Sequence, residues 1–267
     1  MIQLDTLTAA PRAAPPSITL TAVVDTALGV GAGGSSGSLA DKPIVRNARG
    51  QLFIPGSQLK GRLRHECEKL LRGLGWFILE SPKAEPLSLD EEKFNAALRQ
   101  HYHKVSDQVK AGQSEEDFIQ AYGHDFRSGI GHARGYHCLI SKIFGNPILP
   151  ARIVVDDLIC PLTKDELPEI LRPGVSINRR RRVAEDQKVY FLETSPANAQ
   201  LEFTGILQFL PGVPEQAKPL ILAGLGHIHA LGGSKSAGLG WLSWHIEGDA
   251  DTRSFDWKKL LPPGGAP

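Results

Sequence analysis

The sequence has no long apolar run and few cysteines, and each of these absences excludes a class of protein. No apolar stretch approaches the ~20 residues of a membrane-spanning helix, and the N-terminus lacks the basic-then-apolar order of a signal peptide. We therefore expect a cytoplasmic protein with no membrane partner. The cysteines, Cys67, Cys138 and Cys160, are odd in number and do not form a disulfide framework, so a reducing compartment fits them.

The chain also lacks a strong net charge and the fingerprints of nucleotide enzymes. Its formal net charge is +1 over 267 residues, so a site for a polyanion must come from local clustering of cations. Two glycine-rich loops, at 29–38 and 232–240, match neither the P-loop nor the Gly-x-Gly-x-x-Gly pattern. Such loops do permit close approach of backbone N–H groups to a phosphate chain.

What the sequence does contain is the pattern of an α+β core. Helices with apolar residues at helical spacing are expected from Ser57 for roughly five turns, and over 214–231. The order β-α-β-β-α-β is that of a ferredoxin-like fold, with two helices on one face of an antiparallel sheet. The β-branched and alternating residues that predict its strands lie at 17–26, 151–160, 201–210 and 241–246.

One domain is expected over 17–246, with additions to this core. Residues 76–150 are rich in charge and helix formers, so we expect them to form a helical insertion. A short helix is expected at 164–171 and a long hairpin at 172–196. The core then comprises residues 17–75, 151–160 and 200–246, and the ends, 1–16 and 248–267, are expected to be flexible.

The start of the first helix is a candidate phosphate site. Ser57 follows Pro55-Gly56 as a good N-cap. Lys60, Arg62 and Arg64 lie in the first turns, beside free N–H groups and the positive end of the helix dipole. An ordinary amphipathic helix with a solvated basic face is the alternative.

A second cluster of cations lies in the expected hairpin. The four consecutive residues Arg179, Arg180, Arg181 and Arg182 cannot all pack inside a protein. Because the net charge is almost zero and aromatic residues that can stack on bases follow nearby, RNA binding is favoured over a solvated tip. For the 232–240 loop, contact with a polyanion is likewise favoured over a plain tight connection.

A possible metal site lies in the insertion. His124, His132, His137 and Cys138 fall within a short segment, and zinc accepts nitrogen and sulfur donors in sets of four. The spacing matches no compact Cys-x-x-Cys finger, and histidines are common on solvated loops. A structural zinc and no metal both stay open, and the absence of a metal is favoured.

Five motifs in a fixed order carry a resemblance to a known family. Between Ser17 and Ile246 the chain resembles the RAMP superfamily of CRISPR-associated proteins, and most of all the repeated backbone subunit of type III effector complexes. The motifs are Asp41-x-Pro43-Ile44-x-Arg46, Ile54-Pro55-Gly56-Ser57-x-Leu59-Lys60-Gly61-x-Leu63-Arg64, Ile143-Phe144-Gly145, Ser176-Ile177-Asn178-Arg179 and Gly232-Gly233-Ser234-x-Ser236-x-Gly238-x-Gly240.

The resemblance implies a ribonucleoprotein of antiviral defence. An RNA-recognition-motif-like palm would track a guide RNA, neighbouring copies would stack into a filament, and a hairpin thumb would wedge into the guide–target duplex. The implied partners are guide RNA, target RNA and other subunits of the effector complex, including neighbouring backbone subunits. The implied RNA-binding residues are Lys42, Arg46, Ser57, Lys60, Arg64, Arg179, Arg180, Arg181, Arg182, Ser234, Lys235 and Ser236.

The resemblance also implies a catalytic residue. Target-cutting members place an aspartate before the Pro-Ile-Arg strand, where Asp41 stands; it would favour attack of a 2′-hydroxyl on the scissile phosphate, helped by a divalent cation, Mg or Mn. One alternative is a non-catalytic scaffold in which Asp41 caps a turn, because Lys42 replaces the small polar residue expected next. Another is a stand-alone endonuclease that processes precursor guide RNA, with His65, His227 or His229 as the base.

Overall fold

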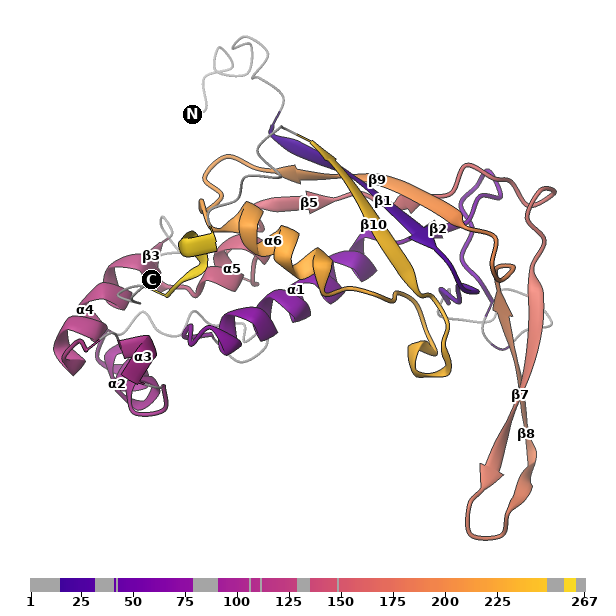
Figure 1. The fold of residues 1–267 in the computed structure, drawn as a ribbon, viewed down its shortest axis with the longest axis horizontal. Coiled ribbons are helices and arrows are strands. Elements are labelled where there is room, and N and C mark those ends of the chain that lie inside the picture. Colours follow the sequence, from indigo (N-terminus) through magenta and orange to yellow (C-terminus); the bar gives the residue numbers. More distant parts are fainter. Residues whose placement is uncertain are drawn as a thin grey trace, which may run out of the picture.

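The computed structural model describes residues 15–31, 41, 43–78, 91–105, 107–110, 112–128, 135–147, 149–248 and 257–262. Its centre is a six-stranded antiparallel sheet in the order β10-β1-β9-β6-β2, with β5 also paired to β9 (Figure 1). The four core strands expected from the sequence correspond, in chain order, to β1, to β5 with β6, to β9 and to β10. Across the sheet they lie in the order fourth, first, third, second. This is the ferredoxin-like arrangement, so the predicted α+β fold class is confirmed. The strands are β1 Ser17–Val24, β2 Phe53–Ile54, β5 Ile153–Val155, β6 Leu158–Ile159, β9 Leu201–Phe209 and β10 Leu242–Gly248.

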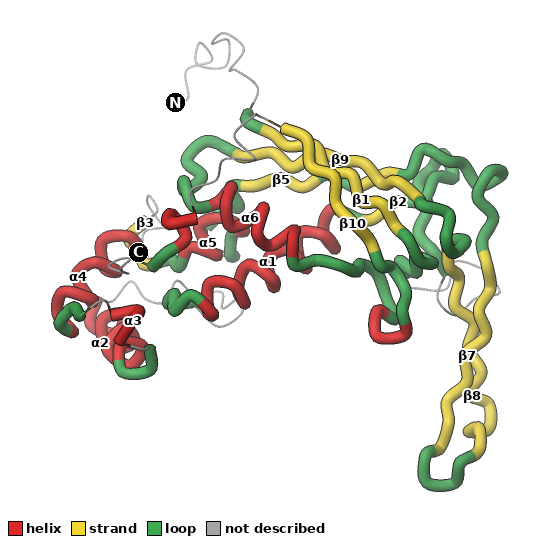
Figure 2. The backbone as a smooth tube through the Cα atoms, viewed as in Figure 1, coloured by secondary structure: helices red, strands yellow, loops and turns green. Residues whose placement is uncertain are grey.

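Two helices cover one face of this sheet, as the sequence predicts. Residues of β1 alternate between the two faces, so that buried apolar side chains such as Leu20 point to the same side. Helices α1 (Gly56–Gly73) and α6 (Ala217–Gly226) lie against that side (Figure 2). They approach closely, since a Cβ added to Gly224 would lie 2.8 Å from the Cys67 Sγ. Burial raises the pKa of the Cys67 thiol far above its usual range, so this cysteine serves packing.

Two elements differ from their predicted extents. The second core strand is broken into β5 and β6 at Asp156-Asp157, where Asp157 approaches β9 so closely that a Cβ on Gly205 would lie 2.7 Å from its carbonyl oxygen. Helix α6 is shorter than the predicted 214–231. It ends where the His227 N–H turns back to the Gly224 carbonyl (3.2 Å) instead of continuing the α-helical ladder.

The short helix predicted at 164–171 does not form. This segment is a turn that leads into β7 at Ile170. Pro168 lies inside the segment, and proline disfavours the helical conformation of the residue before it. The carbonyl of Leu167, which a helix would use internally, instead accepts a hydrogen bond from Arg46 (2.7 Å).

A lobe of helices lies at one end of the sheet (Figure 1). Aromatic residues hold α2 against α4; the ring centroids of partly buried Tyr102 and buried Phe118 are 5.3 Å apart. The C-terminal 3₁₀ helix Trp257–Leu260 lies nearby, with the Leu260 carbonyl accepting the indole N–H of Trp76 (2.8 Å). The segment between α1 and β5 contains α2 Glu91–Tyr102, α3 Asp107–Lys110, α4 Glu115–Phe126, β3 Arg127–Ser128, β4 Gly135–Tyr136 and α5 Leu139–Phe144.

A long hairpin projects from the other end of the sheet (Figure 2). Its strands, β7 (Ile170–Asn178) and β8 (Val183–Thr194), pair only with each other among the described residues. We call the two strands and their turn the thumb hairpin, and residues 190–195, where it returns to the body, the thumb root. No helix in the described ranges is long and apolar enough to cross a membrane.

Candidate nucleic-acid interface

The start of α1 is capped by a carboxylate from another part of the chain. The helix begins at Gly56, its N-cap is Pro55, and no N-cap side chain bonds to it, so the prediction of Ser57 as N-cap was wrong. The Gly56 N–H instead donates to Asp157 Oδ1 (2.7 Å). A Cβ on Gly56 would lie 2.2 Å from the Val155 carbonyl oxygen, so only glycine fits where the helix meets the β5–β6 connection. Ser57 is exposed on the first turn.

The three cations expected at the phosphate site on α1 differ in their partners, and Arg62 is paired with Glu66 (Nη2 to Oε1 2.9 Å). Arg64 bonds Glu68 through Nε (3.0 Å) and the carbonyl of Gly145 through Nη1 (3.1 Å), which ties α1 to the Phe-Gly motif. Lys60 pairs with no carboxylate in the described part of the chain. Burial, and then the positive charge of Arg64, lowers the pKa of Lys60. An anion beside Lys60 would relieve that repulsion, so this lysine gains more from a phosphate than Arg64 does.

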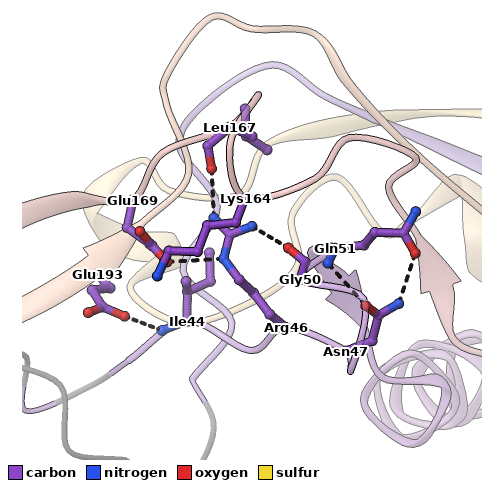
Figure 3. A network of polar contacts seen from close by, with 9 residues as sticks. All are labelled: Ile44, Arg46, Asn47, Gly50, Gln51, Lys164, Leu167, Glu169 and Glu193. Atoms are coloured by element: carbon purple, nitrogen blue, oxygen red, sulfur yellow. Dashed lines mark hydrogen bonds and ion pairs between the residues drawn. The ribbon is translucent and has the colours of Figure 1, made fainter.

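Arg46 lies inside the fold, contrary to its expected role in RNA contact (Figure 3). Its side chain is 11% exposed and forms an ion pair with Glu169 (Nε to Oε1 3.1 Å). The two remaining nitrogens donate to the carbonyls of Gly50 and Leu167, each at 2.7 Å. With every guanidinium nitrogen engaged by the protein, Arg46 joins the 43–52 segment to the turn before β7, and we leave it out of the RNA surface.

The glycines of the 232–240 loop serve the fold first. The Gly233 N–H donates to the Gly29 carbonyl (2.8 Å) and the Gly240 N–H to the Ala27 carbonyl (2.9 Å), so this loop is bonded to the segment after β1. Gly240 has φ +71°, and a Cβ there would lie 1.9 Å from the Leu231 carbonyl oxygen. These two N–H groups are therefore occupied by the protein and do not face a phosphate.

The polar residues of the same loop lie in solvent. Ser234 adopts a left-handed conformation with φ 52° and leads into the one-turn 3₁₀ helix Lys235–Ala237. Ser234, Lys235 and Ser236 are all exposed. The Lys235 ammonium donates to the Gly232 carbonyl (3.0 Å), a neutral acceptor that leaves its charge uncompensated. The loop thus offers side chains, and one free charge, to an anion.

The four arginines lie at the tip of the thumb hairpin. Asn178 organises the turn, since its Oδ1 accepts the N–H groups of Arg180 and Arg181 (both 3.1 Å). Arg179 to Arg182 are exposed, and none of the four guanidinium groups pairs with an acid among the described residues. The tip is therefore an uncompensated cationic cluster held away from the body of the protein (Figure 1).

Asp41 contacts the root of the same hairpin. Its backbone N–H donates to the Phe191 carbonyl (3.0 Å), and its Oδ2 accepts the Phe191 N–H (2.8 Å). The residue is exposed. Its other carboxylate oxygen, Oδ1, has no hydrogen-bond partner within the described ranges. Lys42, also expected to bind RNA, lies outside the described residues.

A family comparison agrees with this arrangement. The family model of the RAMP superfamily matches residues 21–243, which is most of the chain and includes all five motifs. The chain belongs to the RAMP superfamily. This places the RAMP protein among CRISPR-associated RNA-binding proteins. No curated protein matches the chain.

The expected zinc site of this RAMP protein is described only in part. The side chains of His124 and His132 lie outside the described residues. His137 is buried, with Nδ1 3.2 Å from the Asn146 amide nitrogen, and the Cys138 thiol contacts Ser141 (3.5 Å). No group of three potential metal ligands occurs within the described ranges. The two described side chains therefore do not by themselves complete a tetrahedral ligand set.

The histidines considered as bases for a stand-alone endonuclease are scattered. His65 is exposed on α1, and His227 and His229 are exposed just after α6. In the described part of the chain none has a carboxylate that would orient it. No observation favours that alternative for this RAMP protein.

Sequence reasoning missed the residues that hold these segments together. Asp157 bonds Gly56, 101 residues away in the chain. Phe191 bonds Asp41 across 150 residues, and Glu193 bonds Ile44 across 149 residues. Asp157 had a local signal, because two adjacent aspartates interrupt a β-branched run. Phe191 and Glu193 had none, because their contacts depend on where the hairpin returns to the body.

Proposed function

We propose that this RAMP protein is a guide-RNA-binding backbone subunit of a type III CRISPR effector complex, and that it cleaves bound target RNA with Asp41. The observation that carries the proposal is the direct bonding of Asp41 to the root of a hairpin that holds four uncompensated arginines at its tip. A candidate cutting group and a candidate RNA-gripping arm are thus one connected unit. The five motifs and the family support the same proposal.

Guide RNA phosphates would be held by the body of the protein. Lys60 is a half-buried cation that an anion would stabilise, and Lys235 is exposed on the 232–240 loop with its charge uncompensated. Ser234 and Ser236 beside it can donate hydroxyl hydrogen bonds to phosphate oxygens. The arginine tip would grip the guide–target duplex at the far end of the thumb hairpin.

Asp41 would act as the general base for cleavage. Oδ2 is held by the Phe191 N–H, which leaves Oδ1 to accept the proton of a target 2′-hydroxyl. The 2′-oxygen would attack the adjacent phosphorus, the bond to the 5′-oxygen would break, and that oxygen would take a proton from water. The hydroxide left behind would take back the proton held by Asp41, which restores the carboxylate. The products would be a 2′,3′-cyclic phosphate and a 5′-hydroxyl. A positioned general base contributes about 10²–10⁴ in rate.

A divalent cation fits this site only if the substrate supplies ligands. Asp41 offers a single carboxylate, and no cluster of three potential ligands occurs in the described ranges. Mg²⁺ commonly binds through one or two carboxylates together with substrate phosphates. When bound, Mg²⁺ or Mn²⁺ would neutralise charge that develops on the phosphate.

A non-catalytic scaffold is the second candidate, and one observation favours it. The bonds between Asp41 and Phe191 also suit a purely structural role for the carboxylate. Asp41→Asn separates the two roles, because the amide oxygen can still accept the Phe191 N–H but is a poor base. Asp41→Ala removes both functions.

The experiment is single-turnover cleavage of a labelled target RNA by assembled complex carrying each variant. If Asp41 is the base, both variants slow cleavage by about 10² or more, while Asp41→Asn binds target as wild type does. If Asp41→Asn cuts at the wild-type rate, the carboxylate is not the base and the catalytic proposal falls. If the wild-type complex binds guide and target but cuts neither, the scaffold role holds.

A further inference from the structure

The backbone N–H and carbonyl of Phe191, which bond Asp41, are not used to pair β8 with β7. In an antiparallel strand the N–H and C=O of one residue point to the same side. Both groups of Phe191 point to Asp41 and therefore away from β7. Pro173 is the partner of Phe191 on β7. Proline has no N–H, and at this pair no hydrogen bond between β7 and β8 requires one. Asp41 thus closes the outer edge of β8 at this residue.

Two further contacts follow at every second residue of the thumb root, one at Glu193 in β8 and one at Ser195, just after the strand ends. The Glu193 Oε2 accepts the N–H of Ile44 (3.0 Å), a contact that Figure 3 shows. At Ser195, the N–H donates to the Leu28 carbonyl and the Oγ accepts the Leu28 N–H, both at 2.9 Å. The chain before Asp41 and the chain after it are therefore both bonded to the thumb root.

We propose that the thumb root is a clamp that positions Asp41, and that Glu193 is a positioning residue acting through Ile44. Ile44 lies three residues after Asp41, and its N–H has a charged acceptor supplied by the strand that leads back from the arginine tip. Through the thumb hairpin, the clamp connects the arginine tip, which would contact RNA, to the carboxylate of Asp41. This inference rests on the proposed function, since positioning matters for cleavage only if Asp41 cleaves.

Glu193→Ala and Glu193→Gln test the clamp as a matched pair. The glutamine amide oxygen can still accept the Ile44 N–H, whereas alanine cannot. Hydrogen exchange of the Ile44 amide, measured on the full chain, should quicken by about tenfold or more in Glu193→Ala, the effect of losing a bond to a charged acceptor. In Glu193→Gln the exchange should stay near wild type.

The same variants are then compared in assembled complex at saturating target RNA. We expect Glu193→Ala to slow the cleavage step by about tenfold with unchanged affinity for target, and Glu193→Gln to restore the rate. A general loss of structure would instead reduce binding as well. A Glu193→Ala complex that cleaves at the wild-type rate overturns the clamp, and so does a Glu193→Gln complex as slow as the alanine variant.

A proline pair tests the contact at Phe191. Val189 lies two residues before Phe191 in the same register, opposite Val175, so its N–H also points away from β7. Phe191→Pro and Val189→Pro therefore place the same disturbance on the same edge, but only the first removes the donor to Asp41. Slow cleavage in Phe191→Pro alone supports the clamp. Equally slow cleavage in both attributes the effect to the hairpin and overturns the clamp.

The clamp and the proposed function fail separately. If Asp41→Ala cuts normally, the proposed cleavage by Asp41 is wrong whatever the Glu193 variants do. If Asp41→Ala is inactive but Glu193→Ala is fully active, only the clamp is wrong. If wild-type complex does not cut at all, the exchange of Ile44 alone decides the contact, and unchanged exchange in Glu193→Ala refutes it.

Discussion

Replacing Arg46 by alanine should destabilise the protein and leave RNA binding unchanged. The guanidinium group donates to two carbonyls at 2.7 Å and pairs with Glu169 at 3.1 Å. A hydrogen bond to a charged group contributes about 1.5–3 kcal/mol, and breaking a buried ion pair costs about 3–5 kcal/mol. Because the Glu169 side chain is 23% exposed, water recovers part of that loss. We expect a loss of about 3 kcal/mol, or about 6–12 °C in Tm.

Urea unfolding measures the change, and Arg49→Ala is the matched control. Arg49 is exposed in the turn next to Arg46 and pairs with no acid among the described residues. Its substitution should leave the unfolding midpoint unchanged. RNA affinity is measured in parallel over a series of salt concentrations. If Arg46→Ala keeps full stability while the salt slope falls by about 0.7–0.9, Arg46 is a phosphate ligand and the structural reasoning is refuted.

The ion pairs of Glu169 with Arg46 and Lys164 predict that the stability of the fold depends on pH. Burial acts to raise the pKa of Glu169, but the hydrogen bond from Lys164 and the charge of Arg46 outweigh it, so the pKa lies below its ordinary value. A carboxyl with a lowered folded-state pKa stabilises the fold above its unfolded pKa of about 4.3. That stabilisation is lost as the pH falls through the folded pKa. Wild type should therefore lose more stability than Arg46→Ala when the pH is lowered below about 4.3.

Three further predictions concern the thumb tip, the glycine loop and the metal. Arg180→Ala with Arg181→Ala should weaken binding of RNA and reduce the salt slope by about 1.4–1.8, the share of two phosphates; an unchanged slope would remove the tip from the interface. Gly240→Ala and Gly238→Ala should each cost the about 1–2 kcal/mol of a left-handed residue, but only the Cβ added at Gly240 meets a backbone carbonyl, which should add about 1–3 kcal/mol. Equal losses in urea unfolding would contradict the clash at Gly240. Elemental analysis of freshly purified protein should find no stoichiometric zinc, because the spacing of His124, His132, His137 and Cys138 matches no compact zinc finger; one zinc per chain would contradict this.

The elements that the sequence predicted correctly are those with a local signal. Helix α1 and strand β1 carry apolar residues at periods of 3.6 and 2, so they could be placed within a residue or two. The hairpin followed from Pro173-Gly174 and the arginine run, which no core could accept. The errors also have local causes: the 164–171 helix was predicted across Pro168, and the second core strand was drawn through a pair of aspartates.

For the candidate site, the residue types could be foreseen, but their partners could not. Arg46 was expected to face RNA because a Pro-Ile-x-Arg pattern does not show that Glu169, 123 residues later, will lie beside it. Ser57 was expected to cap α1 because the sequence does not show that Asp157 reaches Gly56 first. Each of these roles depends on a long-range contact that local propensity does not determine.

The sequence by itself determined the α+β class, the order of the core elements and the family, because periodicity, turn residues and spaced motifs are local or ordered along the chain. Only the tertiary structure decided which of the expected RNA-binding cations are paired with acids far along the chain and which are left without an acidic partner in the part of the chain that the structure describes. Arg46 is bonded inside the fold, whereas the arginine tip stands in solvent. Tertiary structure also decided that Asp41 is bonded to the thumb root. A charge is available to RNA only when the fold brings no opposite charge to it, and for Arg46 that depends on a residue more than a hundred positions away.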